Sequence, residues 1–313
     1  MIIREATDKD LESIINVLRA SLGETSSKKT MDVWQYKHVD NPFGKSLVLV
    51  AEENGEIIGV RAFMRWKWQY GSNSYDAFRA VDTATHPKHQ GKGIFKKLTY
   101  KALEEGKANG DHFVFNTPND QSKPGYLKMG WKEVGKVRIN IVPQSPFRLL
   151  RKIAQKPDYE LSEFDANLEP LLENYNNRLI SSNKLFTPKS LGYLQWRYLK
   201  NKIQPYLVYH DKDIFVASYL KDRRRFLELR VSECIYSSTI GKKRAKKVIG
   251  EWSTLYKPNF ISYSFDGRLF NLELNGKFGP VLTFKNINCS EEKHIRFLNE
   301  EEWKYTIGDL ELF

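Results

Sequence analysis

The stretch from Ala80 to Phe95, AVDTATHPKHQGKGIF, constrains this chain more than any other part of its sequence. It reads as an apolar strand, a stop at Pro87, a loop containing Gly91 and Gly93, and then the start of a helix. A glycine-rich loop between a strand and a helix N-terminus binds phosphate well, because its amides converge and the helix dipole adds positive potential. The sequence therefore predicts a ligand with phosphate groups at this loop.

The spacing of the glycines excludes two common phosphate motifs. A P-loop has four residues between its glycines followed by Gly-Lys-Ser/Thr, and a dinucleotide fingerprint reads Gly-x-Gly-x-x-Gly. Here Gly91-Lys92-Gly93 is followed by Ile94-Phe95-Lys96, which supplies neither a third glycine nor a hydroxyl for magnesium. An ordinary strand-to-helix turn, with glycines for tightness, remains open at this point.

The remaining pattern, Thr-x-Pro-x-x-Gln-Gly-x-Gly-Ile from Thr85 to Ile94, resembles the acetyl-coenzyme A loop of the GNAT acetyltransferase superfamily. That loop is usually written Val-x-Pro-x-x-Gln/Arg-Gly-x-Gly, so Thr85 replaces an apolar residue. A second segment, Tyr126-Leu127-Lys128-Met129-Gly130-Trp131, resembles the Tyr-x-x-x-Gly-Phe segment of the same superfamily. The resemblance covers residues 1–142 and implies an α/β (α+β) GNAT fold, with a mixed central sheet flanked by helices.

The periodicity of residues 1–142 predicts elements in the order of that fold. Apolar residues at helical spacing from Leu11 to Leu22 predict a helix that is capped by Thr7 or Asp8 and ends at Gly23. A second helix is expected over 31–38, and Asn54-Gly55 between two apolar runs predicts a hairpin. A strand over 75–85 enters the glycine loop, a helix follows over 96–108, and a strand over 112–116 and a short helix over 122–129 come next. A final strand begins in the segment 130–137.

The rest of the chain divides into a linker over residues 143–160 and a second unit over residues 161–313. A weak internal repeat appears there. The segment Trp34-Gln35-Tyr36-Lys37 precedes a proline and a strand pair, and so does the segment Trp196-Arg197-Tyr198. We therefore expect a second, degenerate GNAT-like domain, with an unrelated α/β substrate domain as the alternative. The loop before its helix at 241–252 lacks the glycine spacing, so no coenzyme A is expected there.

The resemblance implies acetyl-coenzyme A as co-substrate and direct transfer of the acetyl group to a primary amine. It places backbone donors for the thioester at the strand end and phosphate donors in the loop. Asn116 and Asn119 would contact the pantetheine arm, and Ser122 would bind a phosphate or cap the next helix. The residues expected to bind the cofactor are Thr83, Ala84, Thr85, Gln90, Gly91, Lys92, Gly93, Ile94, Asn116, Asn119 and Ser122.

Three residues are candidates for catalysis. The resemblance places Tyr126 where many family members have the tyrosine that protonates the leaving thiolate, with aromatic packing as the alternative. Asp82, on the strand that enters the loop, is a candidate base for the amine, directly or through water. A structural hydrogen bond is its alternative role. Glu24, in the loop after the first helix, is a second candidate base.

Composition limits the partners of this chain. Lysine and arginine exceed aspartate and glutamate by 12 charges, which suits a polyphosphate ligand, and no nucleic-acid-binding signature accompanies the basic clusters. No apolar run approaches a membrane span, and no secretory signal is seen, so a cytoplasmic location is expected. With two cysteines and no histidine–cysteine cluster, no metal is expected. A homodimer is left open.

Three functions remain. The first is an N-acetyltransferase acting on a small-molecule amine; the two-domain layout and the aromatic-rich second half favour an amino sugar. The second is a non-catalytic module that binds acetyl-coenzyme A. The third is an aminoacyl transferase similar to the Fem peptidyltransferases, which lack the intact loop that this chain has. Sequence alone leaves the acceptor, the acyl chain length and the oligomeric state open.

Overall fold

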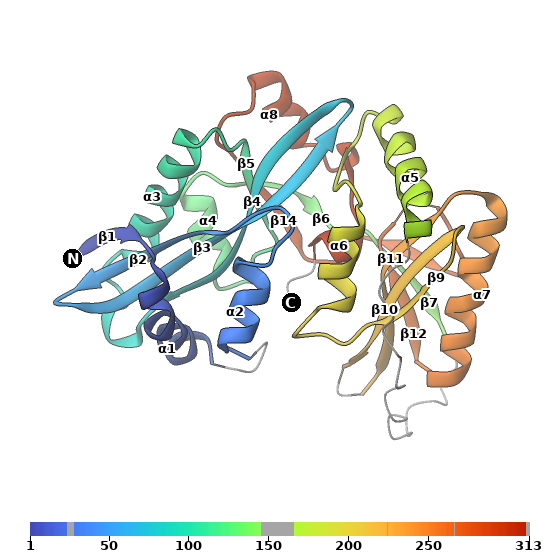
Figure 1. Cartoon of the computed structure of the whole chain (residues 1–313), viewed down its shortest axis with the longest axis horizontal. Coiled ribbons are helices and arrows are strands. Elements are labelled where there is room, and N and C mark those ends of the chain that lie inside the picture. The colour runs from blue at the N-terminus through green and yellow to red at the C-terminus, as the bar shows by residue number, and fades with distance from the viewer. Residues whose placement is uncertain (24–27, 145–165, 224, 266, 311–313) are drawn as a thin grey trace.

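A computed structural model describes residues 1–23, 28–144, 166–223, 225–265 and 267–310 (Figure 1). The first half contains strands and helices in the order expected from the sequence. They are β1 (Ile2–Glu5), α1 (Leu11–Leu22), α2 (Met31–His38), β2 (Leu47–Glu53), β3 (Glu56–Tyr70), β4 (Asn73–Thr85), α3 (Ile94–Ala108), β5 (Phe113–Asn116), α4 (Lys123–Lys128), β6 (Lys132–Lys136) and β7 (Ile139–Pro143).

The second half adds helices and strands over residues 169–310. They are α5 (Glu169–Ser181), β8 (Leu185–Phe186), α6 (Leu191–Leu194), β9 (Leu207–His210), β10 (Ile214–Asp222), β11 (Leu227–Tyr236), α7 (Thr239–Tyr256), β12 (Phe260–Tyr263), β13 (Leu274–Gly276), β14 (Val281–Asn286), α8 (Glu291–Phe297), β15 (Trp303–Lys304) and α9 (Ile307–Leu310). A π-helical turn, Gln195–Leu199, continues α6.

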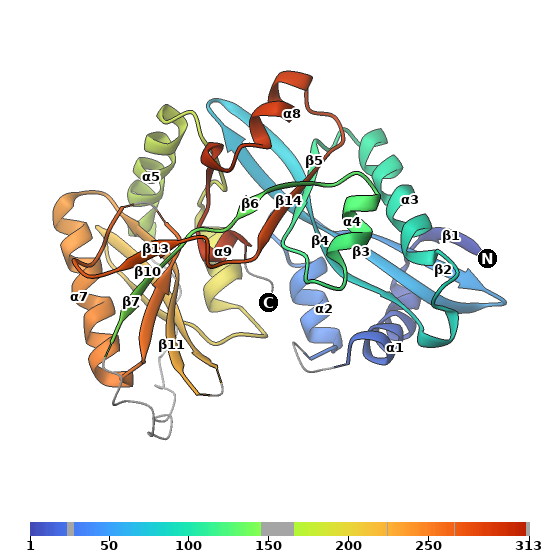
Figure 2. The same ribbon diagram turned by 180° about the vertical axis from the view of Figure 1, so that it is seen from behind.

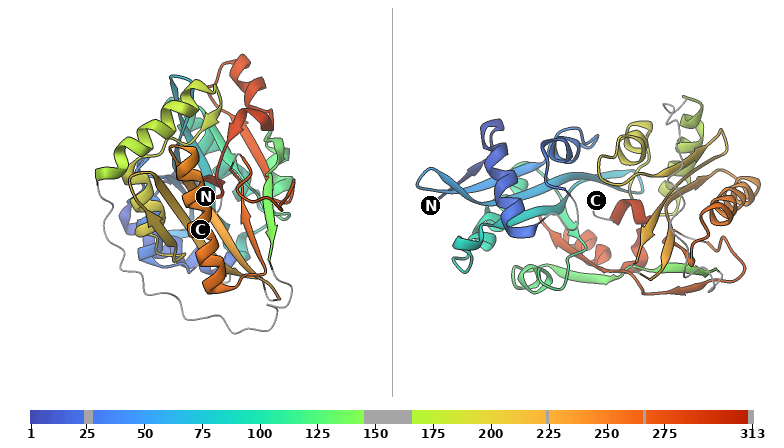
Figure 3. Two further views of the ribbon diagram at one scale, coloured as in Figure 1. Left: turned by 90° about the vertical axis from the view of Figure 1, so that its right-hand side faces the viewer. Right: turned by 90° about the horizontal axis from the view of Figure 1, so that it is seen from below.

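The first sheet has the order β1-β2-β3-β4-β5-β14-β6. Strands β2, β3 and β4 form an antiparallel meander, and β5 returns parallel to β4 after α3. Because neighbouring residues of a strand face opposite sides, β3 packs Val60 and Ala62 with α1 and packs Phe63 with α3. Figure 3 shows α1 and α3 on opposite sides of this sheet.

The second sheet, β13-β7-β12-β11-β10-β9, repeats this plan. Strands β9, β10 and β11 form an antiparallel meander, and β12 returns parallel to β11 after α7. Beyond the parallel strand, each sheet has two more antiparallel strands: β14 and then β6 beside β5, and β7 and then β13 beside β12. The repeated order supports the expected second GNAT-like unit, and the mixed α/β fold with two sheets is as expected.

Each half donates one strand to the sheet of the other half. Strand β7 pairs with β12 in the second sheet, and β14 enters the first sheet between β5 and β6. Consequently β6–β7 and β13–β14 run side by side as one antiparallel ribbon across both sheets (Figure 2). The expected boundary at residue 142 therefore falls inside a strand of the second sheet, and most of the expected linker, from residue 145 to 160, lies outside the described residues.

The two halves also share a core. One cluster of buried side chains extends from α1 and β3 through α6 to α9. The indole nitrogen of Trp66 donates to Thr187 (2.9 Å), and that of Trp196 donates to the carbonyl of Tyr36 (2.8 Å). Every one of the seven tryptophans is less than 10% exposed. The tryptophans therefore pack in the core, and they do not support the sugar acceptor that the aromatic content favoured.

A fully buried charge cluster stabilises the second half. The ammonium group of Lys189 lies 2.7 Å from Asp309 Oδ1 and 2.8 Å from Glu233 Oε2. The hydroxyls of Tyr193 and Tyr198 donate to the same two carboxylates at 3.0 and 3.2 Å. Burial raises the pKa of Glu233 and nearby Asp309 raises it further, whereas Lys189 acts against both. The positive charge of Lys189 thus compensates the two buried carboxylates.

Candidate active site

The glycine loop presents a set of backbone donors at the start of α3. The amide of Gln90 donates a hydrogen bond to the carbonyl of Pro87, and the next backbone amide that donates one is that of Lys97, to the carbonyl of Gly93. In the described part of the chain nothing accepts a hydrogen bond from the amides of residues 91–96, and no side chain caps the helix. Helix termini normally have such donors satisfied. The loop is therefore open to an anion.

Gly91 and Gly93 shape this loop through their backbone angles. Their φ values are +79° and +72°, in the region that side chains with a Cβ rarely adopt. A Cβ added at either glycine would meet no atom within 4 Å, so the space above them is open. Glycine is thus required by the backbone conformation and leaves room for a ligand. The nearby side chains of Lys92 and His89 both lie 3.5 Å from Glu53.

The first sheet opens beside the loop. Strands β4 and β5 pair from Ala77 opposite Phe113 to Arg79 opposite Phe115, and their ladder ends there. The remaining residues of β4 continue to Thr85, and a bulge at Asp82, with φ of +36°, interrupts their pairing with β3. The strand end containing Thr83, Ala84 and Thr85 therefore extends beyond the last β4–β5 pair, next to the loop. The open amides of the loop fit the phosphates of coenzyme A.

Arg61 connects two of the expected site residues and was missed in the sequence. Its guanidinium donates to Thr83 Oγ1 (2.7 Å) and to the Tyr126 hydroxyl (2.8 Å). The residue is 0% exposed, its Nε and Nη2 have no acceptor in the described chain, and rings of Phe63 and Phe95 lie beside it. A buried cation without a carboxylate is costly. The signal in the sequence was a charge inside the apolar run 57–64.

Asp82 points to the other side of β4, toward α2. Its Oδ2 accepts from Lys37 Nζ and lies 2.9 Å from His38 Nε2, while His38 Nδ1 lies 2.9 Å from Ser46 Oγ. Burial alone would raise the pKa of Asp82, but Lys37 and His38 outweigh it and lower the pKa. The carboxylate is therefore held ionised in a buried ion pair, which disfavours it as a free proton acceptor.

The three expected contacts after β5 are engaged with the protein. Asn116 is buried, and its Oδ1 accepts from Thr283 Oγ1 of the exchanged strand β14 (2.5 Å). Asn119 Oδ1 accepts from the amide and the hydroxyl of Ser122, at 2.9 and 2.8 Å. Ser122 occupies the N-cap position of α4 but makes no side-chain cap bond, so the capping alternative was wrong. Their contacts with a cofactor stay predictions.

A small pocket lies on the α2 side of Asp82. It is lined by α1, residues 28–30, α2 and Asp82 itself, and Lys28, Lys29 and Lys37 contribute its positive charge. The expected base Glu24 lies outside the described residues. The bulged strand end therefore separates this pocket from Arg61 and Tyr126, with Asp82 facing the pocket and Thr83 facing the tyrosine.

In the described residues of the second half, the helix start that corresponds to the open loop is capped. This helix, α7, begins after Ser238, whose hydroxyl accepts from the amide of Gly241 (3.1 Å). A Cβ at Gly241 would lie 3.1 Å from the carbonyl of Asp213, so this glycine serves close packing. This capped and crowded helix start therefore differs from the uncapped start of α3. The expectation that no coenzyme A binds there stays a prediction.

His38 predicts a pH dependence of stability. Burial lowers the pKa of His38 below its ordinary value of 6.5, although Asp82 opposes this effect. As the pH falls, His38 is therefore protonated more readily in the unfolded chain than in the folded one. Stability should then fall as pH drops below about 6.5, by up to about 1.4 kcal/mol per pH unit. In thermal unfolding from pH 7 to 5, His38→Gln should lose less stability than wild type. A His294→Gln control on α8 should follow wild type, and equal slopes for all three proteins would refute the assignment.

Comparison with known proteins supports this description. Residues 2–134 match the family described as "Acetyltransferase (GNAT) domain". Over 70 residues, 21% of this chain, the sequence is 38% identical to the L-methionine sulfoximine/L-methionine sulfone acetyltransferase of Salmonella typhimurium and to the L-amino acid N-acyltransferase MnaT of Escherichia coli. The matched stretch spans 37% of the length of each relative.

A solved structure resembles both halves together. A probable N-acyltransferase from Enterococcus faecalis superposes with a TM-score of 0.67, covering 91% of this chain and 72% of that one, at 11% identity. At this identity the likeness shows the fold alone. The open loop at the start of α3 lies within the residues that the family model matches. That match, residues 2–134, covers less than half of the chain.

Two kinds of structural feature are absent from the described residues. No helix there combines the length and apolarity needed to cross a bilayer. No group of three or more histidine, cysteine, aspartate or glutamate side chains there is arranged to hold a metal ion.

Proposed function

We propose that this protein is an N-acetyltransferase that moves an acetyl group from acetyl-coenzyme A to the primary amine of a small molecule. The observation that carries the proposal is the row of unbonded amides over residues 91–96 at the uncapped start of α3. Acetyl-coenzyme A supplies the activated acetyl group when bound. The amides of Gln90 to Ile94 would hold its phosphates, and the strand end at Thr83, Ala84 and Thr85 would face the thioester.

Arg61 and Tyr126 would assist departure of the thiolate. Since the phenolic oxygen of Tyr126 already accepts a hydrogen bond from Arg61, its own proton is left to donate elsewhere. The positive guanidinium also stabilises negative charge that develops on the oxygen as the proton leaves. Arg61 thus orients the tyrosine, and Tyr126 is the proposed acid.

Asp82 would act on the acceptor side. The pocket beside Asp82 measures about 10 Å³, room for about one water. Because Lys37 and His38 hold Asp82 ionised, we propose that the carboxylate orients a water molecule that takes the proton of the acceptor ammonium. The printed names of the two relatives favour an amino acid over an amino sugar as the acceptor.

The proposal is tested by incubating the pure protein with acetyl-coenzyme A and following release of free thiol. The acceptors are L-amino acids, glucosamine and spermidine, each with a no-acceptor control. We expect thiol release with at least one amine and fastest turnover with an amino acid. Cofactor binding without turnover on any amine would favour a non-catalytic module. No cofactor binding would refute the proposal and would leave a Fem-like aminoacyl transferase to be tested.

Tyr126→Phe should slow turnover about 100-fold, the lower end of what a positioned acid contributes, with little change in acetyl-coenzyme A binding. The change removes the hydroxyl but keeps the ring against Phe95 and Trp131. Steady-state kinetics and a calorimetric titration measure the two quantities. Tyr100→Phe, on an exposed tyrosine of α3, is the control and should leave both unchanged. Unchanged turnover in Tyr126→Phe would return Tyr126 to a packing role.

A further inference from the structure

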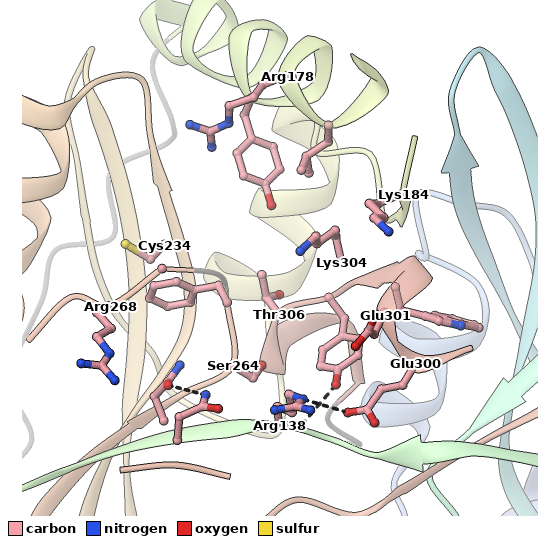
Figure 4. A pocket seen from close by; sticks show the side chains of 18 of the residues that line it. Arg138, Arg178, Lys184, Cys234, Ser264, Arg268, Glu300, Glu301, Lys304 and Thr306 are labelled. Atoms are coloured by element: carbon pink, nitrogen blue, oxygen red, sulfur yellow. Dashed lines mark hydrogen bonds and ion pairs between the residues drawn. The ribbon is translucent and has the colours of Figure 1, made fainter. Parts of the chain in front are cut away.

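A cavity of about 650 Å³ lies in the second half of the molecule, away from the residues described above (Figure 4). It is bounded by α5, the end of β11, the loop after β12, strands β7 and β13 of the ribbon, and residues 300–306. None of the residues expected to bind acetyl-coenzyme A, and none lining the small pocket at Asp82, contributes to its wall. Its size is within the range of pockets that bind small molecules.

The cavity occupies the opening between two parallel strands. The ladder of β11 and β12 ends where Arg230 lies opposite Ser262, and β11 continues to Tyr236. Tyr236 and Ser264, which lie beyond this last pair, line the cavity. In the first sheet β4 and β5 part in the same way, after three residue pairs. The cavity therefore lies where β11 and β12 part, the place in the second sheet that corresponds to the parting of β4 and β5.

A buried hydroxyl in the cavity wall has no partner. Ser264 is 8% exposed, and its Oγ has no hydrogen-bond partner in the described chain. A buried polar group without a partner costs free energy, and such groups are rare in folded proteins. Because Ser264 lines a cavity large enough for a small molecule, a bound ligand would satisfy this hydroxyl.

The charges around the cavity favour an anion. Its wall carries Arg138, Arg178, Lys184, Arg268 and Lys304 against three carboxylates. Three of these cations already face a carboxylate: Arg138 lies 3.6 Å from Glu300, Lys184 lies 3.3 Å from Glu302, and Arg268 lies 3.8 Å from Glu273. Glu300 also lies 2.9 Å from Lys277, outside the wall. The third carboxylate of the wall, Glu301, is exposed.

Arg178 is the cation best placed to meet a ligand. Its guanidinium lies 5.5 Å from the ring centre of Tyr175 and 5.6 Å from that of Tyr236, and no carboxylate of the described residues pairs with it. Figure 4 shows it reaching from α5 on the opposite side of the cavity from Ser264. An arginine flanked by tyrosines offers both charge and aromatic surface.

We propose that this cavity binds a small organic anion bearing a phosphate or carboxylate group. The anionic group faces Arg178, the tyrosines beside it contact the apolar part of the ligand, and the hydroxyl of Ser264 hydrogen-bonds its polar end. The site is separate from the acetyl-coenzyme A loop, and it does not depend on the proposed transferase activity.

The test uses the full chain carrying Gly91→Glu, so that anions binding at the glycine loop do not contribute to the measured signal. Pyrophosphate represents phosphates, citrate represents carboxylates, and both are titrated by calorimetry and thermal shift at constant ionic strength. We expect saturable binding of at least one anion. Adding Arg178→Ala should weaken it at least tenfold, whereas Arg225→Ala, on an exposed arginine outside the cavity, should not change it.

Ser264→Ala separates binding from folding. If the hydroxyl serves a ligand, this variant binds the anion several-fold more weakly while the unliganded protein melts no lower than its parent. Three results would overturn the proposal: no saturable binding of either anion, equal binding in the Arg178→Ala protein, or stabilisation by spermidine in place of the anions. A failed acetylation assay would leave the proposal standing, because no step of the test requires turnover.

Discussion

Replacing Gly91 with glutamate should lower the affinity for acetyl-coenzyme A roughly 100-fold or more. This corresponds to a loss of about 2.7 kcal/mol or more of binding free energy. The side chain would enter the open space above the loop, where the amides of residues 91–96 have no partners. Its carboxylate would compete for these amides and would repel the phosphates of the ligand. A calorimetric titration of the variant measures the loss.

Gly110→Glu is the matched control. Gly110 follows the other end of α3, has a φ of +81° against +79° for Gly91, and also has no atom within 4 Å of an added Cβ. Both variants should therefore lose a similar amount of stability from backbone strain, about 1–2 kcal/mol. Only Gly91→Glu should lose the cofactor. If Gly91→Glu binds acetyl-coenzyme A as wild type does, the loop has been misassigned.

Lys189→Met should lower the free energy of unfolding by about 3–5 kcal/mol, as expected when one partner of a buried charge pair is removed. Glu233 and Asp309 would then face each other in the core without their shared cation. Equilibrium denaturation with urea measures the change. Adding Glu233→Gln to the same protein should recover part of the loss, because it removes one of the two uncompensated charges.

Lys184→Met provides the comparison for that experiment. Lys184 also pairs with a glutamate, Glu302 at 3.3 Å, but its side chain is 29% exposed to solvent. Ion pairs near the surface contribute less than about 1 kcal/mol, so this variant should unfold almost as wild type does. Equal destabilisation by the two lysine variants would contradict the central role assigned to the buried cluster.

Local sequence pattern predicted the elements of the first half because each depends on neighbouring residues. Apolar periodicity predicted α1, Asn54-Gly55 predicted the hairpin, and the glycine spacing predicted the loop at the start of α3. In the second half, the helix expected at 241–252 agrees with α7 (Thr239–Tyr256). These features need no knowledge of what lies far away in the chain.

The sequence could not reveal the exchange of β7 and β14. A strand shows which of its faces is apolar, but it does not show which sheet it will join, since its partners are set by tertiary packing. The same limit applies to the site. Arg61 and Tyr126 are 65 positions apart, and Asp82 is 45 positions from Lys37, so no local pattern indicates that they meet.

Titration of the wild-type chain with acetyl-coenzyme A most directly tests the central claim, that residues 91–96 form the cofactor site. The loop has open amides, whereas the corresponding helix start in the second half is capped by Ser238. The predicted result is therefore one tight site per chain in wild type and none in Gly91→Glu. Absence of binding to wild type, a second site of equal affinity, or a site that survives in Gly91→Glu would contradict it.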